Sequence, residues 1–304
     1  MNFSNFDELL GLVRGRANHV AVPGANNPEA LEAIKLADEA GLISGGYLIG
    51  EREAVSGTAA RCGLNTAKFT VIDCAGMADM CAEAVRLVTQ GKADFLVKGL
   101  VDTRLYMKAI LNKEAGLVPP GALLNHFALL TAANYKKPFV ITDSAILISP
   151  DLSQKVKILN NSIEILHRLG VAEPKISVVC PVEKVNEAMP STVAARELAE
   201  LNRSGGIAGA VVEGPYDVYI SFSRAAADEK GITGGVVPGD ADLLLMPNLD
   251  AGNLVYKSII QLGAGIGAAA ILVGAKIPAI LPSRADTPAT KLNSIALAAY
   301  LKRN

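Results

Sequence analysis

The chain has 304 residues, half of them hydrophobic, and a formal net charge of −1. That length suits one large α/β domain or two domains of ordinary size. The near-neutral charge, with no basic block, excludes the electrostatic footprint of a nucleic-acid-binding protein, so we expect no nucleic-acid partner.

Short β-branched runs recur along the chain and predict strands. Most are continuous apolar runs, not alternating ones, which is typical of parallel strands covered on both faces. The predicted strands span 19–23, 46–50, 69–73, 94–99, 139–143, 176–180, 209–214, 241–247, 269–274 and 278–282.

Helical patterns lie between these runs. NPEALEAIKLADEAG and MADMCAEAVRLVTQG both end in Gly, and Gly170 closes the apolar stripe of DLSQKVKILNNSIEILHRLG. The alternation of strands and helices predicts a doubly wound α/β fold. Because ten strands are many for one open sheet, we predict two such lobes around a cleft. The first lobe would be 1–137 plus 283–304, because the C-terminal helix returns to it. The second lobe would be 138–282.

The segment DADLLLMPNLDAGNLVYKSIIQLG predicts a strand followed directly by a helix. The strand ends at Pro247, and Asn248, Asp250, Gly252 and Asn253 open the helix. In open α/β sheets such turns lie where ligands bind, and the free amides at a helix start favour an anion. A simple Asx-capped helix is the alternative interpretation.

LPSRADTPATK (281–291) also joins a strand to a helix. Thr287 suits the N-cap, Pro288 the first helical position, and Asp286 is favourable beside the macrodipole. Ser283 and Arg284 have no such structural explanation. An arginine at a helix N-terminus is repelled unless an anion is shared, so we predict an anion site here.

In GKADFLVKGLVDTRLYMKAILNKEAG, Lys98 ends a predicted strand and Asp102 can cap the next helix. Arg104 and Lys108 then lie one turn apart. These cations could reach a phosphate or form a solvated basic face.

VPGANNPEAL (22–31) has the strand–loop–helix order of a phosphate-binding motif but only one glycine, and GAGIGAA (263–269) is interpreted as a connection.

The remaining titratable residues predict no metal site. The histidines are far apart, and His126 in LLNHFALL is interpreted as a core histidine.

The cysteines form no CxxC pair, which favours reduced thiols. The N-terminal MNFSNFDELLGLVRGR is unlike a signal peptide, so we expect a cytoplasmic protein. The apolar stretch 262–282 is broken by Lys276 and prolines, so no membrane span is expected. The cysteines are Cys62, Cys74, Cys81 and Cys180.

Several of these stretches, together with FVITDSAILISPDLSQKVKILNNSIEI and VEKVNEAMPSTVAA, resemble the phosphate acetyl/butyryltransferases. The most specific parts are SRAD and AGN-x-x-YK, and the butyryl enzymes are the more similar. The resemblance implies two α/β/α lobes, an architecture like isocitrate and isopropylmalate dehydrogenases. It also implies that an acyl group passes between coenzyme A and inorganic phosphate by direct attack in a ternary complex. The CoA thioester is then a substrate, no cofactor or metal is tightly bound, and a homo-oligomer (dimer or higher) is expected.

The resemblance also assigns roles to residues. Ser283 and Arg284 match the family's Ser-Arg pair, with Arg284 on the phosphoryl group and Ser283 at the reacting centre. The aspartate proposed as base in the acetyl enzymes falls at Thr290, which leaves Asp286 as a substitute or as a cap. Candidate phosphate- or CoA-binding residues are Lys98, Lys108, His126, Asp250, Gly252, Asn253 and Lys257.

Three positions depart from the family pattern and leave the acyl group open. Tyr219 and Asn248 stand where aspartates are usual, and Asn125 replaces the serine that precedes His126 in the butyryl enzymes. The alternatives are a phosphate acetyltransferase or an inactive relative that binds CoA or acyl phosphate. An NAD-dependent, metal-requiring dehydrogenase would need clustered carboxylates or histidines, which the sequence does not offer.

Overall fold

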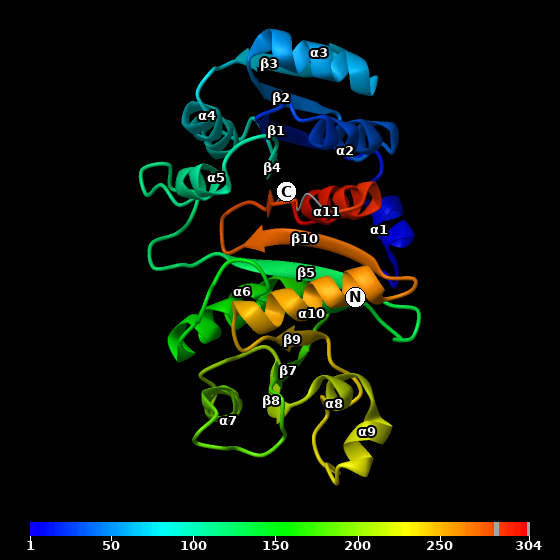
Figure 1. Cartoon of the computed structure of the whole chain (residues 1–304), viewed down its shortest axis with the longest axis vertical. Coiled ribbons are helices and arrows are strands. Elements are labelled where there is room, and N and C mark those ends of the chain that lie inside the picture. Colours follow the sequence, from blue (N-terminus) through cyan, green and yellow to red (C-terminus); the bar gives the residue numbers. More distant parts are fainter. Residues whose placement is uncertain (283–285, 303–304) are drawn as a thin grey trace. The chain divides into compact units, whose positions relative to one another are not determined.

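A computed structural model describes residues 1–282 and 286–302. They form two compact units (Figure 1). The terminal unit combines Phe6–Ala122 with the chain from Ala268 onward, and the central unit combines Met1–Asn5 with Leu123–Gly267. The chain therefore passes between units at 5/6, 122/123 and 267/268. The crossings predicted from the sequence were at 137/138 and 282/283. An α/β architecture is confirmed in both units.

The terminal unit has the strand order β3-β2-β1-β4-β11-β10. Neighbours from β3 to β11 are parallel, and β10 is antiparallel to β11. The strands are β1 (His19–Pro23), β2 (Gly45–Gly50), β3 (Phe69–Asp73), β4 (Phe95–Val97), β10 (Gly267–Val273) and β11 (Ala279–Ile280). The helices are α1 (Phe6–Val13), α2 (Pro28–Glu39), α3 (Arg52–Cys62), η1 (Thr66–Lys68), α4 (Met77–Thr89), α5 (Thr103–Ile110) and α11 (Pro288–Tyr300).

Helix starts in the terminal unit follow the predicted capping chemistry. The Asn27 side chain accepts from the Ala30 amide ahead of α2, and Asp102 accepts from the first amides of α5. Thr287 caps α11 and Pro288 takes its first position, as predicted. α11 is buried along most of its length and packs on α1 and α2. α2 and α11 are rich in alanine, which allows close approach, and α1 buries Phe6, Leu9 and Val13.

Two glycines let the loops after β1 and β4 touch. The Gly99 amide donates to the Pro23 carbonyl at 3.0 Å, and the Leu100 amide donates to the Gly24 carbonyl at 2.8 Å. A Cβ on Gly99 would lie 2.2 Å from the Gly24 oxygen, and Gly24 has a φ of +71°. Any side chain at Gly99 would therefore separate the two loops.

The central unit has the strand order β5-β6-β9-β7-β8. β6, β9, β7 and β8 are parallel, and β5 is antiparallel to β6. The strands are β5 (Asn125–Thr131), β6 (Phe139–Thr142), β7 (Lys175–Val179), β8 (Val211–Tyr216) and β9 (Leu243–Leu245). The helices are α6 (Leu152–Arg168), α7 (Pro190–Arg203), α8 (Val218–Phe222), α9 (Arg224–Glu229) and α10 (Leu249–Leu262).

The prediction that the strands are parallel was wrong for β10, which is antiparallel to β11. β5 was not predicted as a strand at all, although its residues are almost all buried. A buried antiparallel strand has the same continuous apolar pattern as a buried parallel one, so sequence periodicity cannot separate the two. The connection between α10 and β10, predicted from GAGIGAA, is confirmed at 263–266.

All four cysteines are free; Cys81 and Cys180 are buried, and Cys62 and Cys74 are half-buried. Burial raises the pKa of Cys81 to about 11. Within residues 1–282 and 286–302, no helix has both the length and the apolarity needed to cross a membrane.

A lysine cluster surrounds one carboxylate of the central unit. Asp240 lies 2.9 Å from Lys136 and 3.0 Å from Lys137, and it also pairs with Lys175. Burial alone would raise the pKa of Asp240, but the hydrogen bonds from Lys175, Lys136 and Lys137 outweigh it and hold that pKa well below its usual value. The cluster ties the loop after β5 to the start of β7 and to the segment before β9.

We predict that Asp240→Asn lowers the free energy of unfolding at pH 7 by about 1–2 kcal/mol, because three cations lose their counter-charge. A carboxylate with a depressed folded pKa stabilises above its ordinary pKa of 3.8, so the difference from wild type should shrink as the pH falls below that value. Urea unfolding of the wild type and the variant at pH 7 and pH 3 measures this difference in the free energy of unfolding. Asp228→Asn, in an exposed pair with Arg224, is the control and should change little.

Candidate functional site

The carboxyl edge of the terminal sheet has the geometry of a ligand site. β1 pairs with β2 on one side and with β4 on the other, so the strand order reverses between β1 and β4. Ligands of open α/β sheets bind at such a reversal, beyond the carboxyl ends of the strands. The β1–α2 and β4–α5 loops meet here, and β11 ends beside β4 with Ile280 paired to Val97.

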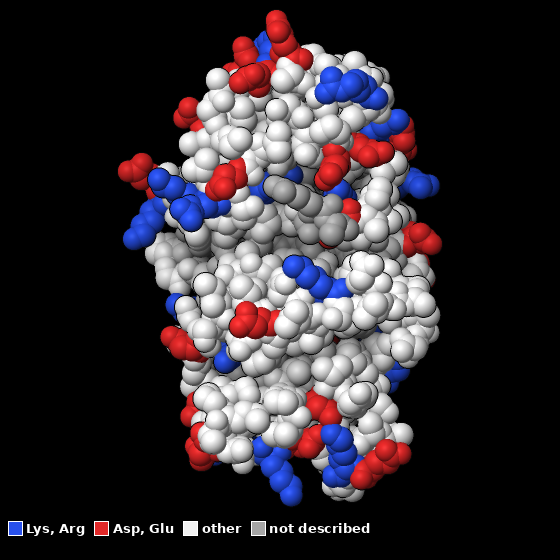
Figure 2. Space-filling model, viewed as in Figure 1, with Lys and Arg blue, Asp and Glu red and all other residues white. Residues whose placement is uncertain are grey.

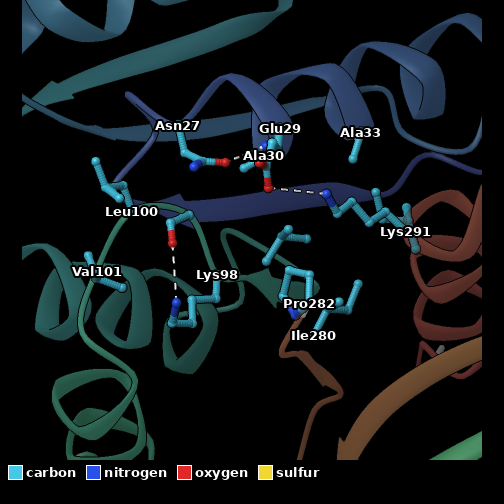
Figure 3. A pocket seen from close by; sticks show the side chains of 13 residues that line it. Asn27, Glu29, Ala30, Ala33, Lys98, Leu100, Val101, Ile280, Pro282 and Lys291 are labelled. Atoms are coloured by element: carbon cyan, nitrogen blue, oxygen red, sulfur yellow. Dashed lines mark hydrogen bonds and ion pairs between the residues drawn. The ribbon is translucent and has the colours of Figure 1, made fainter. Parts of the chain in front are cut away.

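A cavity of about 90 Å³ lies at this edge (Figure 3). Its polar side chains are Asn27, Glu29, Lys98 and Lys291. Lys98 follows β4 as predicted, is half-buried, and directs its Nζ to the Gly99 carbonyl at 3.4 Å. Lys291, on α11, has a side chain only 10% exposed, and its Nζ lies 3.4 Å from Glu29 Oε2. The sequence singled out Lys98 but not Lys291 or Glu29.

The chain beyond β11 supplies the predicted Ser-Arg pair. Pro282 lines the cavity, and Ser283 and Arg284 come next in the sequence but lie outside the described residues. Asp286 is half-buried and borders a second cavity together with Glu29 and Lys291. The side chains of Thr287 and Thr290 are hydrogen-bonded to each other at 3.0 Å. Thr290, which stands at the position of the family's aspartate, therefore takes part in capping α11.

Basic side chains gather over α5. Arg104 and Lys108 are both exposed and lie one turn apart, as predicted, with exposed Lys113 just beyond the helix. Figure 2 shows this patch at the level of α5, whereas acidic and basic side chains alternate over most of the rest of that face. Lys108 is therefore presented to solvent, where it can meet a mobile anion.

The central sheet has its own polar edge, at the carboxyl ends of β6 and β9. These strands are in register, with Thr142 opposite Leu245. Asn248 accepts from the Ala251 amide to cap α10, and Asn253 Nδ2 donates to the Ser144 carbonyl at 2.9 Å. The loop after β6 is thereby fixed to the first turns of α10.

Gly252 is required by this packing. A Cβ there would lie 2.4 Å from the Asp143 carbonyl oxygen and 3.1 Å from Ser144 Cα. The sequence interpreted Gly252 as a place where a backbone approaches a ligand; the backbone that approaches it is that of the 143–144 loop. Gly252 and Asn253 therefore position α10 relative to this loop.

His126 lies in the same polar group and is buried. Its Nδ1 is 2.9 Å from Ser144 Oγ, and its ring makes an edge contact with Tyr256. Burial lowers the pKa of His126 to about 4, so the imidazole is neutral at physiological pH. It can exchange a hydrogen bond with Ser144 but has no positive charge for a phosphate.

The neighbouring Asn125 is also buried and bonded inside the protein. Its amide donates to Thr142 Oγ1 at 2.9 Å, and its carbonyl accepts from Asn161 Nδ2 at 2.9 Å. The departure from the family's serine at this position is therefore accommodated by a complete hydrogen-bond network. No free group of Asn125 faces a ligand.

The other predicted residues of the central unit lie apart from this group. Asp250 and Lys257 are exposed on α10. Tyr219 is 74% exposed on α8, and the nearby Asp217 caps that helix and pairs with Lys230. Within residues 1–282 and 286–302, His, Cys, Asp and Glu side chains form no cluster of three that could hold a metal ion.

Comparison with known proteins shows the family to which the chain belongs. Residues 75–299 match the family model described as phosphate acetyl/butaryl transferase. The chain therefore belongs to the phosphate acetyl/butyryl transferase family. The match begins before α4 and ends within α11, so it includes Lys98, the 143–144 loop, α10 and the SRAD segment.

Individual relatives are similar over nearly their whole length. The phosphate butyryltransferase of Clostridium beijerinckii is 39% identical, covering 98% of this chain and 97% of that protein. The phosphate acetyltransferase of Thermotoga maritima is 34% identical, covering 96% and 98%. The crystal structure of a branched-chain phosphotransacylase from Enterococcus faecalis superposes with a TM-score of 0.83 at 29% identity, covering 94% of this chain and 100% of that one.

We predict that Gly252→Ala destabilises the protein by about 1–3 kcal/mol, because the new methyl group displaces the 143–144 backbone. Thermal unfolding monitored by circular dichroism measures the loss. Gly11→Ala is the matched control, since Gly11 lies in α1 with no atom within 4 Å of an added Cβ. That variant should be stabilised by about 0.5–1 kcal/mol. Equal stability of the two variants would contradict the packing described for α10.

A pH dependence follows from His126. Its folded pKa of about 4 lies below the ordinary 6.5, so the unfolded chain binds the proton more readily. The free energy of unfolding therefore has its full value above about pH 6.5. It declines as the pH falls towards 4, by at most about 3 kcal/mol. We expect His126→Gln to remove this slope, whereas His167→Gln, on the exposed surface, should keep it. Chemical unfolding at several pH values between 4 and 7.5 measures both.

Proposed function

We propose that this protein exchanges a short acyl group between coenzyme A and inorganic phosphate, with butyryl-CoA and phosphate giving butyryl phosphate and CoA. The observation that supports this most is family membership combined with 39% identity to a phosphate butyryltransferase over nearly the whole of both chains. The cavity at the strand reversal of the terminal sheet, with two lysines beside it, supports the same proposal independently.

The chemistry requires charge neutralisation more than a strong base. A phosphate oxygen attacks the thioester carbonyl, the tetrahedral intermediate collapses, the C–S bond breaks and CoA leaves as its thiolate. Arg284 and Lys98 would offset the negative charge of phosphate and intermediate, and Ser283 would donate a hydrogen bond to the reacting centre. A thiol has a pKa of about 8.5, so its thiolate leaves with little proton assistance.

Asp286 is a weaker candidate for the base than its sequence position suggested. Glu29 and Glu32 border the same cavity as Asp286, so their negative charges would repel a phosphate dianion there, and Lys291 is the nearby cation. Position 290, where the acetyl enzymes have an aspartate, is a threonine bonded to Thr287. We therefore infer that inorganic phosphate attacks as its dianion without a dedicated protein base.

The acetyl reaction is the second candidate. The 34% identical relative from Thermotoga maritima, a phosphate acetyltransferase, favours it. The choice depends on how much of the acyl chain the protein can bury, since each methylene placed in an apolar pocket changes kcat/KM by about tenfold or more.

The proposal also includes a cytoplasmic homo-oligomer, dimer or higher, that binds no cofactor tightly. α10 supports the oligomer because it is apolar yet exposed: Leu254 is 67% and Leu262 82% accessible. These two leucines offer apolar area that another subunit would cover in the proposed oligomer.

We predict that the purified protein releases CoA from butyryl-CoA only when phosphate is present, and that Arg284→Ala lowers kcat/KM by about 10²–10³-fold. A thiol reagent detects the CoA. Arg196→Ala, an exposed arginine paired with Glu187, is the control and should retain activity. Unchanged phosphate dependence in Arg284→Ala would remove that residue from the site, and no CoA release from any short acyl-CoA would reject the function.

A further inference from the structure

Helix α10 of the central unit is apolar in sequence, yet little of its surface is covered. Gly252 is its one buried residue, and the others are half-buried or exposed. In residues 1–282 and 286–302, the four most exposed large apolar side chains are Leu262, Ile148, Tyr219 and Leu254, at 82%, 74%, 74% and 67%. Two of them belong to α10. Ile148 lies at its start, where its carbonyl accepts from the Leu249 amide at 3.0 Å. Apolar side chains gathered in this way indicate an interaction surface, whereas scattered ones do not.

Two opposite charges lie on the exposed face of α10. Asp250 and Lys257 are both exposed, and neither has an ion-pair or hydrogen-bond partner among the described residues. Because they are seven residues apart, they lie on the same face but about 10 Å apart along the axis, too far to pair within one helix. Leu254 lies between them on this face. In Figures 1 and 2, α10 is on the side turned to the viewer, and most of the surface over it is uncharged.

This pattern of charges is complementary to itself after a half-turn. If a second α10 packs antiparallel about a two-fold axis beside Leu254, each Asp250 faces the partner's Lys257 and the two Leu254 side chains meet at the axis. A parallel pair would instead place aspartate against aspartate and lysine against lysine, which is unfavourable. The charges therefore favour one orientation, and they favour an identical helix as the partner.

The apolar ends of α10 match in the same orientation. Antiparallel packing brings the start of the partner's helix, with the partner's Ile148, towards the C-terminal end of this one. Leu262 is exposed there, and an apolar cavity of about 560 Å³ lies beside that end of the helix. Its principal lining side chains are Tyr135, Phe139, Phe222, Ile259 and Ile266. The apolar surface thus continues beyond the helix, where the partner can cover it.

We propose that α10 forms an isologous interface with α10 of a second copy of this chain, packed antiparallel about a two-fold axis beside Leu254. The inference rests on the oligomer within the proposed function, and adds which residues recognise the partner and in which orientation. Leucine burial supplies the affinity, and the reciprocal Asp250–Lys257 pairs set the orientation, because exposed ion pairs contribute more to specificity than to affinity. α10 also holds the 143–144 loop through Gly252 and Asn253, so the interface braces the polar edge of the central sheet.

Leu254→Glu tests the centre of the interface, because it places two carboxylates at the axis. We expect the Kd of self-association to rise by at least about 100-fold. Analytical ultracentrifugation over a range of protein concentrations measures it, and circular dichroism establishes that the variant folds. Leu12→Glu, at a partly exposed leucine on α1 of the terminal unit, is the matched control and should keep the assembly.

Charge reversal tests the orientation. Asp250→Lys alone, or Lys257→Asp alone, sets like charges against each other at both ends of the interface, and we expect the Kd to rise by about tenfold or more. Both changes in one chain should restore self-association. Copies with Asp250→Lys mixed with copies carrying Lys257→Asp should form mixed dimers, because every facing pair is then opposite in charge. Native mass spectrometry distinguishes mixed dimers from dimers of like copies.

Several results would overturn the proposal. A wild-type protein that stays monomeric would do so, as would an assembly that Leu254→Glu leaves intact; in the second case the oligomer stands but uses another surface. Loss of assembly in Leu254→Glu, without mixed dimers from the charge variants, would reject the antiparallel orientation. Unchanged assembly of Lys257→Asp with a raised KM for butyryl-CoA would return that lysine to a CoA site. Phosphate-dependent CoA release by the wild type is measured separately, so its absence beside the predicted assembly rejects the reaction alone.

Discussion

The direct contact between two loop backbones, at Gly24 and Gly99, is the constraint on which the terminal unit's site depends. Two peptide hydrogen bonds join the loops, and the missing side chain at Gly99 leaves room for them. The contact fixes the end of β4 against the start of α2. Lys98, the cavity wall on α2 and the end of β11 are consequently held in one place, which is the preorganisation that an active site requires.

This arrangement suits a ligand with two chemically different halves. An acyl phosphate or thioester has a short apolar chain next to a reacting carbonyl and a strongly anionic or leaving group. The cavity beside β4 is lined by both apolar and polar side chains, and Lys98 places a cation at its wall. In the proposed reaction Arg284 would supply a second cation for the phosphate. The pair between Lys291 and Glu29 keeps a buried ammonium group compensated, because an unpaired charge at a side chain only 10% exposed would be costly.

Much of the fold could be predicted because the strands are short, apolar and separated by clear helix signals. The bounds of β1 and β3 agree with the prediction, and the caps at Asp102 and Thr287 follow from side-chain chemistry alone. β5 was missed because LLNHFALL has neither turn residues nor a period that separates strand from helix. The direction of β5 and β10 depends on pairing across the chain, which no local pattern encodes.

The site was predictable where its residues end a strand or begin a helix, as Lys98 does. Lys291 was missed because it lies in the first turn of a helix whose burial is known only from its packing on α1 and α2. Gly252 was singled out as a glycine that approaches a ligand, and in the structure the group close to it is the 143–144 backbone. The cavity cannot be predicted from any one segment, since its walls come from α2, β4, β11 and α11.

Phosphorus NMR of butyryl-CoA mixed with inorganic phosphate and the purified protein tests the central claim most directly. The account predicts an acyl phosphate signal that grows in equal proportion to free CoA and declines again when excess CoA is added. Release of CoA without an acyl phosphate signal, or at the same rate when phosphate is omitted, would contradict it.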